Sequence, residues 1–220
     1  MGCVTPARRR LSPDARANQL LDVGAELFAE KPYDDVLMEE VAERAGVSRA
    51  LLYRHFPGKR ELFAAVYRQA AGRLLAATEL DPDTPPSQWL KAGLDAHIDY
   101  FAANRHTVLA ANRGLAGDQV IQGIINDELD ELRRRVLVAI DLDAGQLDAA
   151  RREMASAAVM SWLVFVRALC VDWLTHHPRG YTRTRLRDIA IGALTGALGP
   201  ITGDGPPLTG GGPPTLRHPR

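Results

Sequence analysis

A basic segment near the N-terminus contains the residues with the clearest potential for chemistry. Residues 44–60 include five lysines and arginines and no acidic residue, although the whole chain balances 27 basic against 27 acidic side chains. An arginine such as Arg54 can donate two hydrogen bonds to a guanine, and a leucine such as Leu51 can contact the methyl group of a thymine. Tyrosine hydroxyls, here that of Tyr53, and lysine amines commonly bind phosphate. The segment therefore predicts a surface that binds DNA, with a more acidic remainder of the chain.

Two short helices joined by a tight turn would position these side chains. The first has apolar residues at the spacing of one helix face: Met38, Val41 and Ala42. Ala45 and Gly46 then end it, because Gly46 can adopt the left-handed backbone conformation that such a turn needs. We expect Val47 to be buried in the turn and Ser48 to cap the second helix by accepting a backbone hydrogen bond.

The second of these helices has an inner and an outer face. Projected at about 100° per residue, Leu52 and Phe56 fall on the inner side. The outer side carries the residues that we expect in the major groove: Ala50, Leu51 and Arg54, flanked by Arg49 and Tyr53. An A-G-V-S turn or a run of charge is by itself common in helical proteins. The prediction depends on turn, face and charge occurring together.

A further basic cluster precedes the first predicted helix. Residues 8–10 are three arginines, and they lie just before Ser12 at the cap position, Pro13 at the first helical position and Asp14 in the first turn. We expect residues 1–11 to form a flexible basic arm that reaches along the phosphates.

The N-terminal third of the chain resembles the TetR family of bacterial one-component repressors. The resemblance begins with the apolar residues of the first helix: Leu20, Leu21, Leu27 and Phe28. It continues through E-E-V-A-E-R-A-G-V-S-R-A-L-L-Y-R-H-F and P-G-K-R-E-L-F. The L-Y-x-H-F followed by K-x-E-L-F is the specific part, because few other helix-turn-helix proteins follow the recognition helix with this Tyr, Phe and Lys.

The resemblance implies a role for each matching position. Tyr53 and Lys59 match phosphate contacts, with Lys59 at the start of the fourth helix. The full set expected to bind DNA is Ser48, Arg49, Ala50, Leu51, Tyr53, Arg54, His55 and Lys59. The chain departs from the family at Pro32, where Gly is frequent, and at Val36 and Leu37, where two hydroxyl residues are frequent. The usual cap of the second helix is therefore missing, at a cost of about 1 kcal/mol.

Length and pattern predict an all-α fold with two domains. The chain has 220 residues, of which 46% are hydrophobic, and no segment shows the alternation of a strand. We expect an N-terminal three-helix helix-turn-helix domain and a larger α-helical domain for ligand binding and dimerisation. The predicted limits are a flexible basic arm at 1–11, the DNA-binding domain at 12–58, a connecting helix at 59–80, the effector-binding and dimerisation domain at 81–200 and a disordered tail at 201–220.

Composition also bears on the cellular location. No run of 18 apolar residues is evident and the N-terminus lacks an apolar stretch, so we expect a cytoplasmic protein without a membrane contact. The two cysteines, Cys3 and Cys170, offer no disulfide framework and we expect reduced thiols without a function.

The larger domain is predicted to contain long helices over 89–104, 118–141 and 146–177. A shorter, irregular helix is predicted over 105–117, and the last helix ends near Leu198. The last helix carries a stripe of apolar and small residues that suits a dimer interface: Leu186, Ile189, Ala190, Ala193, Leu194 and Ala197. Together with 146–177, this stripe predicts a four-helix interface between two subunits. The alternative is that both helices merely pack inside one subunit.

Aromatic and polar residues of the same domain are candidates for an effector site. They are His97, Tyr100, Phe101, Trp162, Phe165 and Arg167, and they fit a small, largely apolar ligand. Such residues are also common in an ordinary core. Arg167 interrupts an apolar run and needs a partner, which is either an anionic ligand, a carboxylate such as Asp172, or a carboxylate across the dimer.

Other chemistry lacks a matching set of residues. The histidines do not have metal-ligand spacing, and there is no phosphate-binding loop, nucleophile elbow or H-E-x-x-H motif. We therefore expect no enzyme, no cofactor and no metal. The sequence predicts a homodimeric transcriptional repressor that a small ligand releases from a palindromic operator in double-stranded DNA. The alternatives are a helical protein-interaction module whose helix-turn-helix no longer reads DNA and, without a residue set behind it, an α-helical enzyme.

Overall fold

The regular elements of the protein are helical throughout residues 12–79, 84–144, 147–176 and 182–203, which are the residues that the computed structural model describes. This confirms the all-α prediction. The basic arm with its three arginines, Cys3, and the tail from residue 204 lie outside these ranges. The chain forms two compact units, one of residues 12–77 with 99–128 and one of residues 78–98 with 129–203. The boundaries between these two units lie after residues 77, 98 and 128 and differ from the predicted domain limits.

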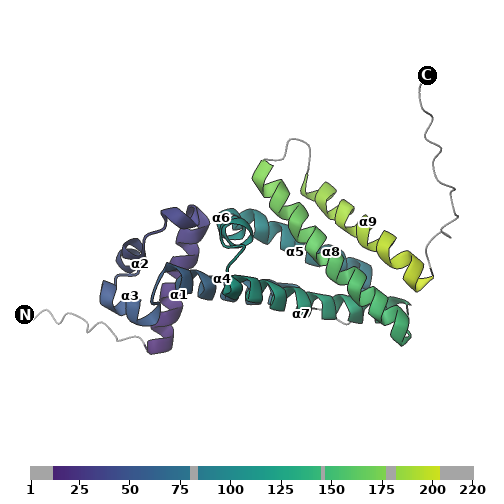
Figure 1. The fold of residues 1–220 in the computed structure, drawn as a ribbon, viewed down its shortest axis with the longest axis horizontal. Coiled ribbons are helices and arrows are strands. Elements are labelled where there is room, and N and C mark those ends of the chain that lie inside the picture. Colours follow the sequence, from purple (N-terminus) through teal and green to yellow (C-terminus); the bar gives the residue numbers. More distant parts are fainter. Residues whose placement is uncertain (1–11, 80–83, 145–146, 177–181, 204–220) are drawn as a thin grey trace, which may run out of the picture. The chain divides into compact units, whose positions relative to one another are not determined.

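The elements follow one another as α1 (Pro13–Glu30), the short 3-10 turn η1 (Tyr33–Asp35), α2 (Met38–Arg44), α3 (Arg49–His55), α4 (Lys59–Ala77), α5 (Pro86–Ala103), α6 (Arg105–Leu109), the π-helical segment η2 (Ala110–Gly114), α7 (Gln119–Ala144), α8 (Ala149–His176) and α9 (Arg183–Thr202) (Figure 1). Helices α5 and α7 each contribute to both units.

Helix α1 begins as its sequence predicts and packs closely against α4. The Ser12 side chain accepts a hydrogen bond from the backbone N–H of Ala15, at 3.2 Å, and Pro13 is the first helical residue. A Cβ atom at Gly24 would lie 3.2 Å from Val66 and 3.3 Å from Leu62 of α4. Glycine at this position therefore allows the two helices to approach.

The core of the first unit contains a chain of aromatic rings. Phe63 of α4 contacts Phe28 edge-on, with 5.0 Å between the ring centroids, and Tyr33 edge-on at 5.2 Å. Tyr67 stacks on Phe63 at 6.0 Å. These rings join α1, η1 and α4, so the start of α4 is fixed against the end of α1.

The irregular segment predicted at 105–117 is present as α6 and η2. Its side chains bind the C-terminal carbonyls of α1, which have no partner inside that helix. The Thr107 hydroxyl donates to the carbonyl of Phe28 at 3.0 Å, and the His106 ring nitrogen Nδ1 lies 3.1 Å from the carbonyl oxygen of Ala29. Segment 104–114 therefore belongs to the same unit as the N-terminal helices.

The second unit is organised by the packing of α8 against α9. Trp162 of α8 donates its indole N–H to the carbonyl of Ala190 in α9 at 2.7 Å. Arg187 of α9 is bound to Asp95 of α5 through two hydrogen bonds of 3.1 Å. Within the described residues, α8 is the one helix long and apolar enough to span a membrane, and 44% of its most apolar window is buried inside the chain. Its contacts with α9 are those of a core helix.

Candidate nucleic-acid interface

The predicted helix-turn-helix is formed by α2 and α3. Met38, Val41 and Ala42 are buried. Gly46 has a φ of 62°, the left-handed conformation that the turn was expected to need. The Ser48 side chain accepts from the backbone N–H of Leu51 at 3.2 Å and caps α3. Val47 is half-buried rather than buried, which differs from the prediction, and its backbone N–H donates to the carbonyl of Ala42 in the turn at 2.9 Å.

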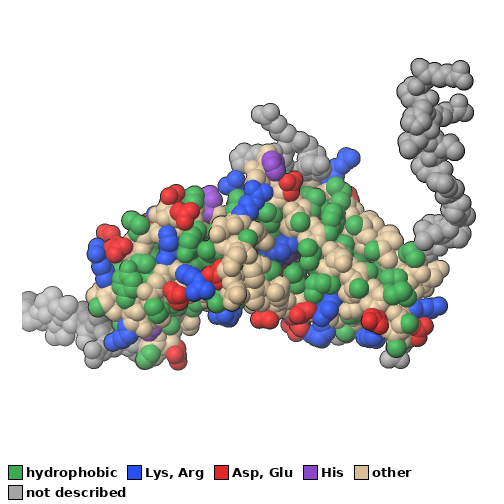
Figure 2. Space-filling model, in the orientation of Figure 1, with side chains coloured by type: hydrophobic (Ala, Val, Ile, Leu, Met, Phe, Trp, Pro, Cys, Tyr) green, Lys and Arg blue, Asp and Glu red, His purple; other side chains and the backbone are tan. Residues whose placement is uncertain are grey.

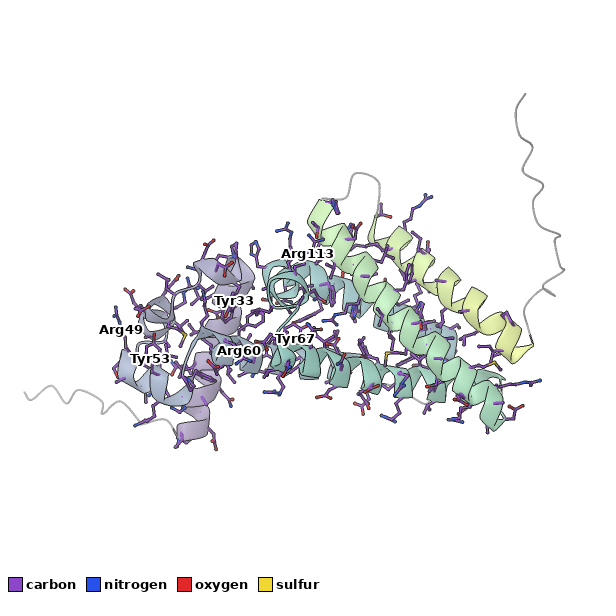
Figure 3. The ribbon with its side chains drawn as sticks, in the orientation of Figure 1. Tyr33, Arg49, Tyr53, Arg60, Tyr67 and Arg113 are labelled. Carbon is purple, nitrogen blue, oxygen red and sulfur yellow. The ribbon has the colours of Figure 1, made fainter. Side chains whose placement is uncertain are left out.

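Helix α3 presents a largely exposed outer face. Ser48, Arg49, Ala50, Tyr53 and Arg54 are exposed, and Figure 3 shows Arg49 and Tyr53 on this helix. Leu52 is fully buried on the inner side, as expected. The remaining residues of the helix are intermediate: Leu51, His55 and the following Phe56. Leu51 lies only one residue, or about 100°, from the buried Leu52, so part of its surface is covered.

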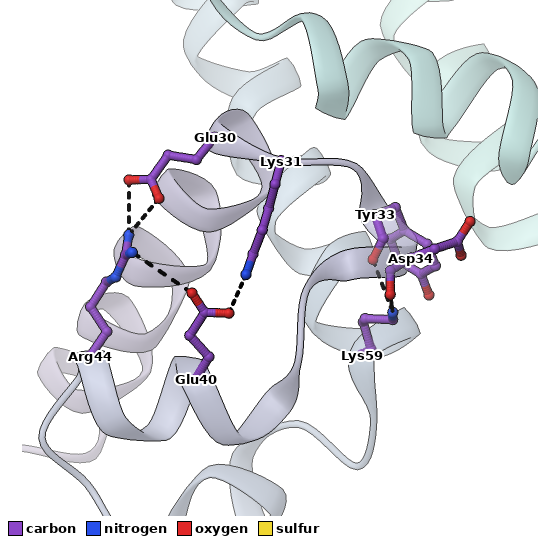
Figure 4. A network of polar contacts seen from close by, with 7 residues as sticks. All are labelled: Glu30, Lys31, Tyr33, Asp34, Glu40, Arg44 and Lys59. Carbon is purple, nitrogen blue, oxygen red and sulfur yellow. Dashed lines mark hydrogen bonds and ion pairs between the residues drawn. The ribbon is translucent and has the colours of Figure 1, made fainter.

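Lys59 is held by backbone carbonyls next to this helix. Its ammonium donates to the carbonyl of Tyr33 at 2.9 Å and to that of Asp34 at 3.0 Å, and it lies 4.6 Å from the centre of the Tyr33 ring (Figure 4). An ammonium has three N–H groups. One N–H therefore remains for an anion such as a phosphate, on a side chain whose position is already fixed.

Helix α2 begins without a side-chain cap. Leu37 occupies the cap position, makes no side-chain hydrogen bond and is 59% exposed. Val36 is fully buried, so its side chain is not available to DNA. Glu39 in the first turn lies 3.6 Å from the guanidinium of Arg49 in α3. The pair links the start of α2 to the start of the recognition helix.

A network of ion pairs between α1 and α2 was not anticipated from the sequence. Arg44 donates to both oxygens of Glu30, at 2.9 and 3.0 Å, and lies 3.8 Å from Glu40, which also binds Lys31 (Figure 4). Only the Glu40–Arg44 spacing of four residues is a local signal. The network connects α2 to the end of α1.

The residues proposed for the effector site divide between the two units. Tyr100 and Phe101 belong to the first unit, where Phe101 is 1% exposed and Tyr100 is half-buried. The other four belong to the second unit: His97, Trp162, Phe165 and Arg167. Three of these four are buried, whereas Phe165 is 40% exposed on the outer side of α8.

Two buried polar groups in the second unit influence one another. Burial in apolar surroundings lowers the pKa of His97 to about 3, and the positive charge of Arg167 contributes in the same direction. His97 is therefore neutral at physiological pH. Burial also raises the pKa of Cys170 to about 12, which disfavours the reactive thiolate form. Asp172, proposed as a partner of Arg167, is largely exposed and pairs with His176 at 3.0 Å.

The six residues of the proposed dimer stripe do not share one environment. Leu186, Ala190 and Leu194 are buried against the same chain, with exposures of 1, 1 and 4%. Ile189 is half-buried, and Ala193 and Ala197 are exposed. Three residues turn a helix by about 300°, so the second row lies about 60° from the first. Only this second row is left for a partner.

An apolar row is also exposed on α8. Its larger members are Met154, Val164 and Phe165, at 53, 51 and 40% exposure, and Ala157, Ser161 and Ala168 lie between or beside them. Figure 2 shows hydrophobic side chains at the surface along α8.

Among the described residues, no group of three or more His, Cys, Asp or Glu side chains could hold a metal ion.

Helices α2 and α3 have the arrangement of a helix-turn-helix, and comparison with known proteins specifies the family. Residues 20–66 match the family model of bacterial regulatory proteins, tetR family. The chain is 31% identical over 161 residues to the HTH-type transcriptional activator FasR of Mycolicibacterium smegmatis. The aligned region covers 64% of this chain and 74% of FasR. The chain belongs to the TetR family of transcriptional regulators.

Solved structures share the fold. A tetR-family regulator from Streptomyces coelicolor superimposes with a TM-score of 0.73 at 22% identity, over 88% of this chain and 84% of that one. FadR from Bacillus subtilis, solved in complex with stearoyl-CoA, gives a TM-score of 0.60 at 16% identity, over 82% of this chain and 96% of that one. The proteins to which the chain is related are regulators, not enzymes.

Proposed function

We propose that this regulator is a homodimeric repressor that a small, largely apolar ligand releases from a palindromic operator. The observation that carries the proposal is the outer face of α3, where exposed Arg49, Tyr53 and Arg54 lie on a helix fixed by its cap and by the buried Leu52. A cytoplasmic location follows from this function.

The proposed contacts divide into base readers and phosphate binders. Arg54 and Leu51 read bases, Ala50 allows the helix to approach, and Tyr53 and Lys59 bind phosphate. Ser48, Arg49 and His55 complete the contact surface. Lys59 suits its role because two backbone carbonyls orient its ammonium, so little side-chain freedom is lost when a phosphate binds.

A second copy of the chain is proposed to cover the exposed rows of α8 and α9. Val164 and Phe165 of α8, with Ala193 and Ala197 of α9, offer apolar surface whose burial would stabilise a dimer. A short recognition helix reads only a few base pairs, and a two-fold dimer doubles the sequence that is read. In this proposal Phe165 belongs to the dimer interface rather than to the effector site.

The effector is proposed to bind among buried side chains of the second unit. Trp162 would contribute apolar surface, and the buried Arg167 with neutral His97 would contribute polar groups. FadR from Bacillus subtilis, which shares the fold, was solved in complex with stearoyl-CoA, and this supports small molecules with an apolar acyl chain as the first class to test.

The test uses DNA that the protein itself selects from a random library. Arg54→Ala should cost about 1 to 3 kcal/mol on the selected operator and relax its specificity, whereas Lys59→Ala should weaken binding to all duplexes and reduce the salt slope by about one. Fluorescence anisotropy at several salt concentrations measures both effects. Equal losses on operator and random DNA for Arg54→Ala would exclude its base-reading role.

Repression and activation are separated by a reporter assay, because the related FasR is named an activator. Expression from the operator-bearing promoter should rise when the regulator gene is deleted. A fall would identify an activator with the same DNA-binding surface.

A further inference from the structure

Helix α4 begins with two adjacent cations that bind different parts of the first unit. Lys59 binds the carbonyls of Tyr33 and Asp34 in η1. Arg60 binds Asp118, which is 58 residues further along the chain: its Nε donates to Oδ2, and its Nη2 donates to Oδ1 at 3.3 Å. The first turn of α4 is therefore tied both to η1 and to the start of α7.

Asp118 is also the cap of α7. Its carboxylate accepts from the backbone N–H groups of Val120 at 2.9 Å and Ile121 at 3.1 Å. Its side chain is 11% exposed, whereas that of Arg60 is 49% exposed. One carboxylate thus fixes the first turns of two helices, and a shift of α7 would be transmitted directly to Arg60.

The charge of Asp118 does not depend on pH in the physiological range. The hydrogen bonds from Arg60, followed by the backbone bond from Ile121, lower the pKa of Asp118 to about 2. Asp118 is therefore charged at physiological pH, so the Arg60–Asp118 pair is not a pH switch.

The same part of the chain holds α1 as well. Thr107 and His106 bind the last carbonyls of α1, as described above. Helix α2 packs on α1, and α3 packs on α2. Residues between 104 and 121 therefore bind both the end of α1 and the start of α4, the two helices that precede and follow the helix-turn-helix.

We propose that Asp118 is a positioning residue for DNA binding, which holds the first turn of α4 so that Lys59 meets a phosphate. The inference rests on the proposed phosphate contact of Lys59. Hydrogen bonds to oxygen weaken beyond about 3.2 Å, so a displacement of α4 by about 1 Å is enough to lose this contact. Asp118 acts through α4 without touching DNA.

Asp118→Asn is the main test, because asparagine is as good a helix cap as aspartate. The substitution removes the charge and weakens the pair while the cap of α7 is retained. Arg60→Gln removes the pair from the other side, and the double variant tests whether both changes act through the same contact. Asp130→Asn is the matched control, since it removes one charge from the same helix and affects only a pair with Arg133.

Dissociation constants are measured for the full-length protein on the selected operator and on a scrambled duplex of equal composition. Each single variant and the double variant should weaken binding to both duplexes by the same factor, about threefold to tenfold, because a charge-assisted phosphate bond is loosened without a change in base reading. Hydrogen exchange of the backbone in residues 57–63 should become faster in the same variants. Asp130→Asn should leave affinity and exchange unchanged.

Three results would overturn the inference. Unchanged affinity in Asp118→Asn, with Lys59→Ala still weakening binding, would leave the phosphate contact intact and remove the role of Asp118. Loss of affinity in Arg60→Gln alone would show that Arg60 touches DNA itself. No effect of Lys59→Ala would remove the premise, and with it the proposed contact of Lys59.

Discussion

His97 should make the second unit less stable in mild acid. Its folded pKa of about 3 lies below the ordinary value of 6.5, so the unfolded chain binds the proton more readily. A group with a lowered folded pKa contributes stability that is present above pH 6.5 and is lost as the pH falls towards 3. The physical cause is that a charged imidazole would lose its hydration at a buried position and face the charge of Arg167.

The magnitude follows from the two pKa values. One unit of difference corresponds to about 1.4 kcal/mol, so the interval between 6.5 and about 3 limits the total loss to about 5 kcal/mol. Between pH 7.5 and pH 5 the unfolded state becomes protonated while the folded state does not. About 2 kcal/mol of stability should disappear in this window.

Urea unfolding of wild type and His97→Gln at fixed protein concentration, followed by circular dichroism from pH 7.5 to 5, measures this difference. The variant should lose about 2 kcal/mol less than the wild type over the window, whatever its stability at pH 7.5. His176→Gln is the control, because the His176 side chain is 69% exposed. The same slope in wild type and His97→Gln would refute the reasoning.

Further predictions concern the dimer, the core and the recognition helix. Ala193→Glu should leave the fold intact, since Ala193 is exposed in the single chain, but should split the dimer in sedimentation experiments by placing a charge in the interface; an intact dimer would locate the interface elsewhere. Phe101→Ala and Trp162→Ala should each lower the free energy of unfolding by about 3 to 5 kcal/mol, measured by thermal or urea unfolding. Trp162→Ala should also alter the concentration of apolar ligand needed to release operator DNA. An unaltered response would place the effector away from Trp162. Glu39→Gln should free Arg49 from its ion pair and tighten binding to random duplex by up to about fivefold, because an exposed ion pair contributes up to about 1 kcal/mol. Glu43→Gln, at an exposed position of the same helix, is the matched control. Equal effects of both substitutions would show that only the net charge matters. Thr107→Val should leave the buried carbonyl of Phe28 without its hydroxyl donor and cost about 1 to 3 kcal/mol of stability in urea unfolding; no loss would mean that another donor replaces the hydroxyl.

Features that depend on neighbouring residues could be predicted without the structure. Ser12, Gly46 and Ser48 end or begin helices through contacts within three residues or through the local backbone conformation, so their types and order suffice. The apolar spacing of α2 and the buried Leu52 of α3 follow from helical periodicity in the same way. The family resemblance extended this local information to the contact surface and to Lys59.

The sequence could not indicate which row of a helix is covered by another helix. The stripe of α9 is apolar on two adjacent rows, and only the packing on α8 decides that Leu186 and Leu194 are buried while Ala193 stays exposed. Phe165 shows the same limit, because an aromatic residue in an apolar helix can face the core or a partner.

Polar contacts between distant residues could not be predicted and depend on how the helices pack. Lys59 with the carbonyls of η1, Glu30 with Arg44 and Arg60 with Asp118 join residues 14 to 58 positions apart. A charged side chain on a helix surface has many possible partners of similar energy, and no periodicity selects one of them. The selection is made when the apolar faces of α1, α4 and the start of α7 are buried, because that packing brings these particular charges within bonding distance.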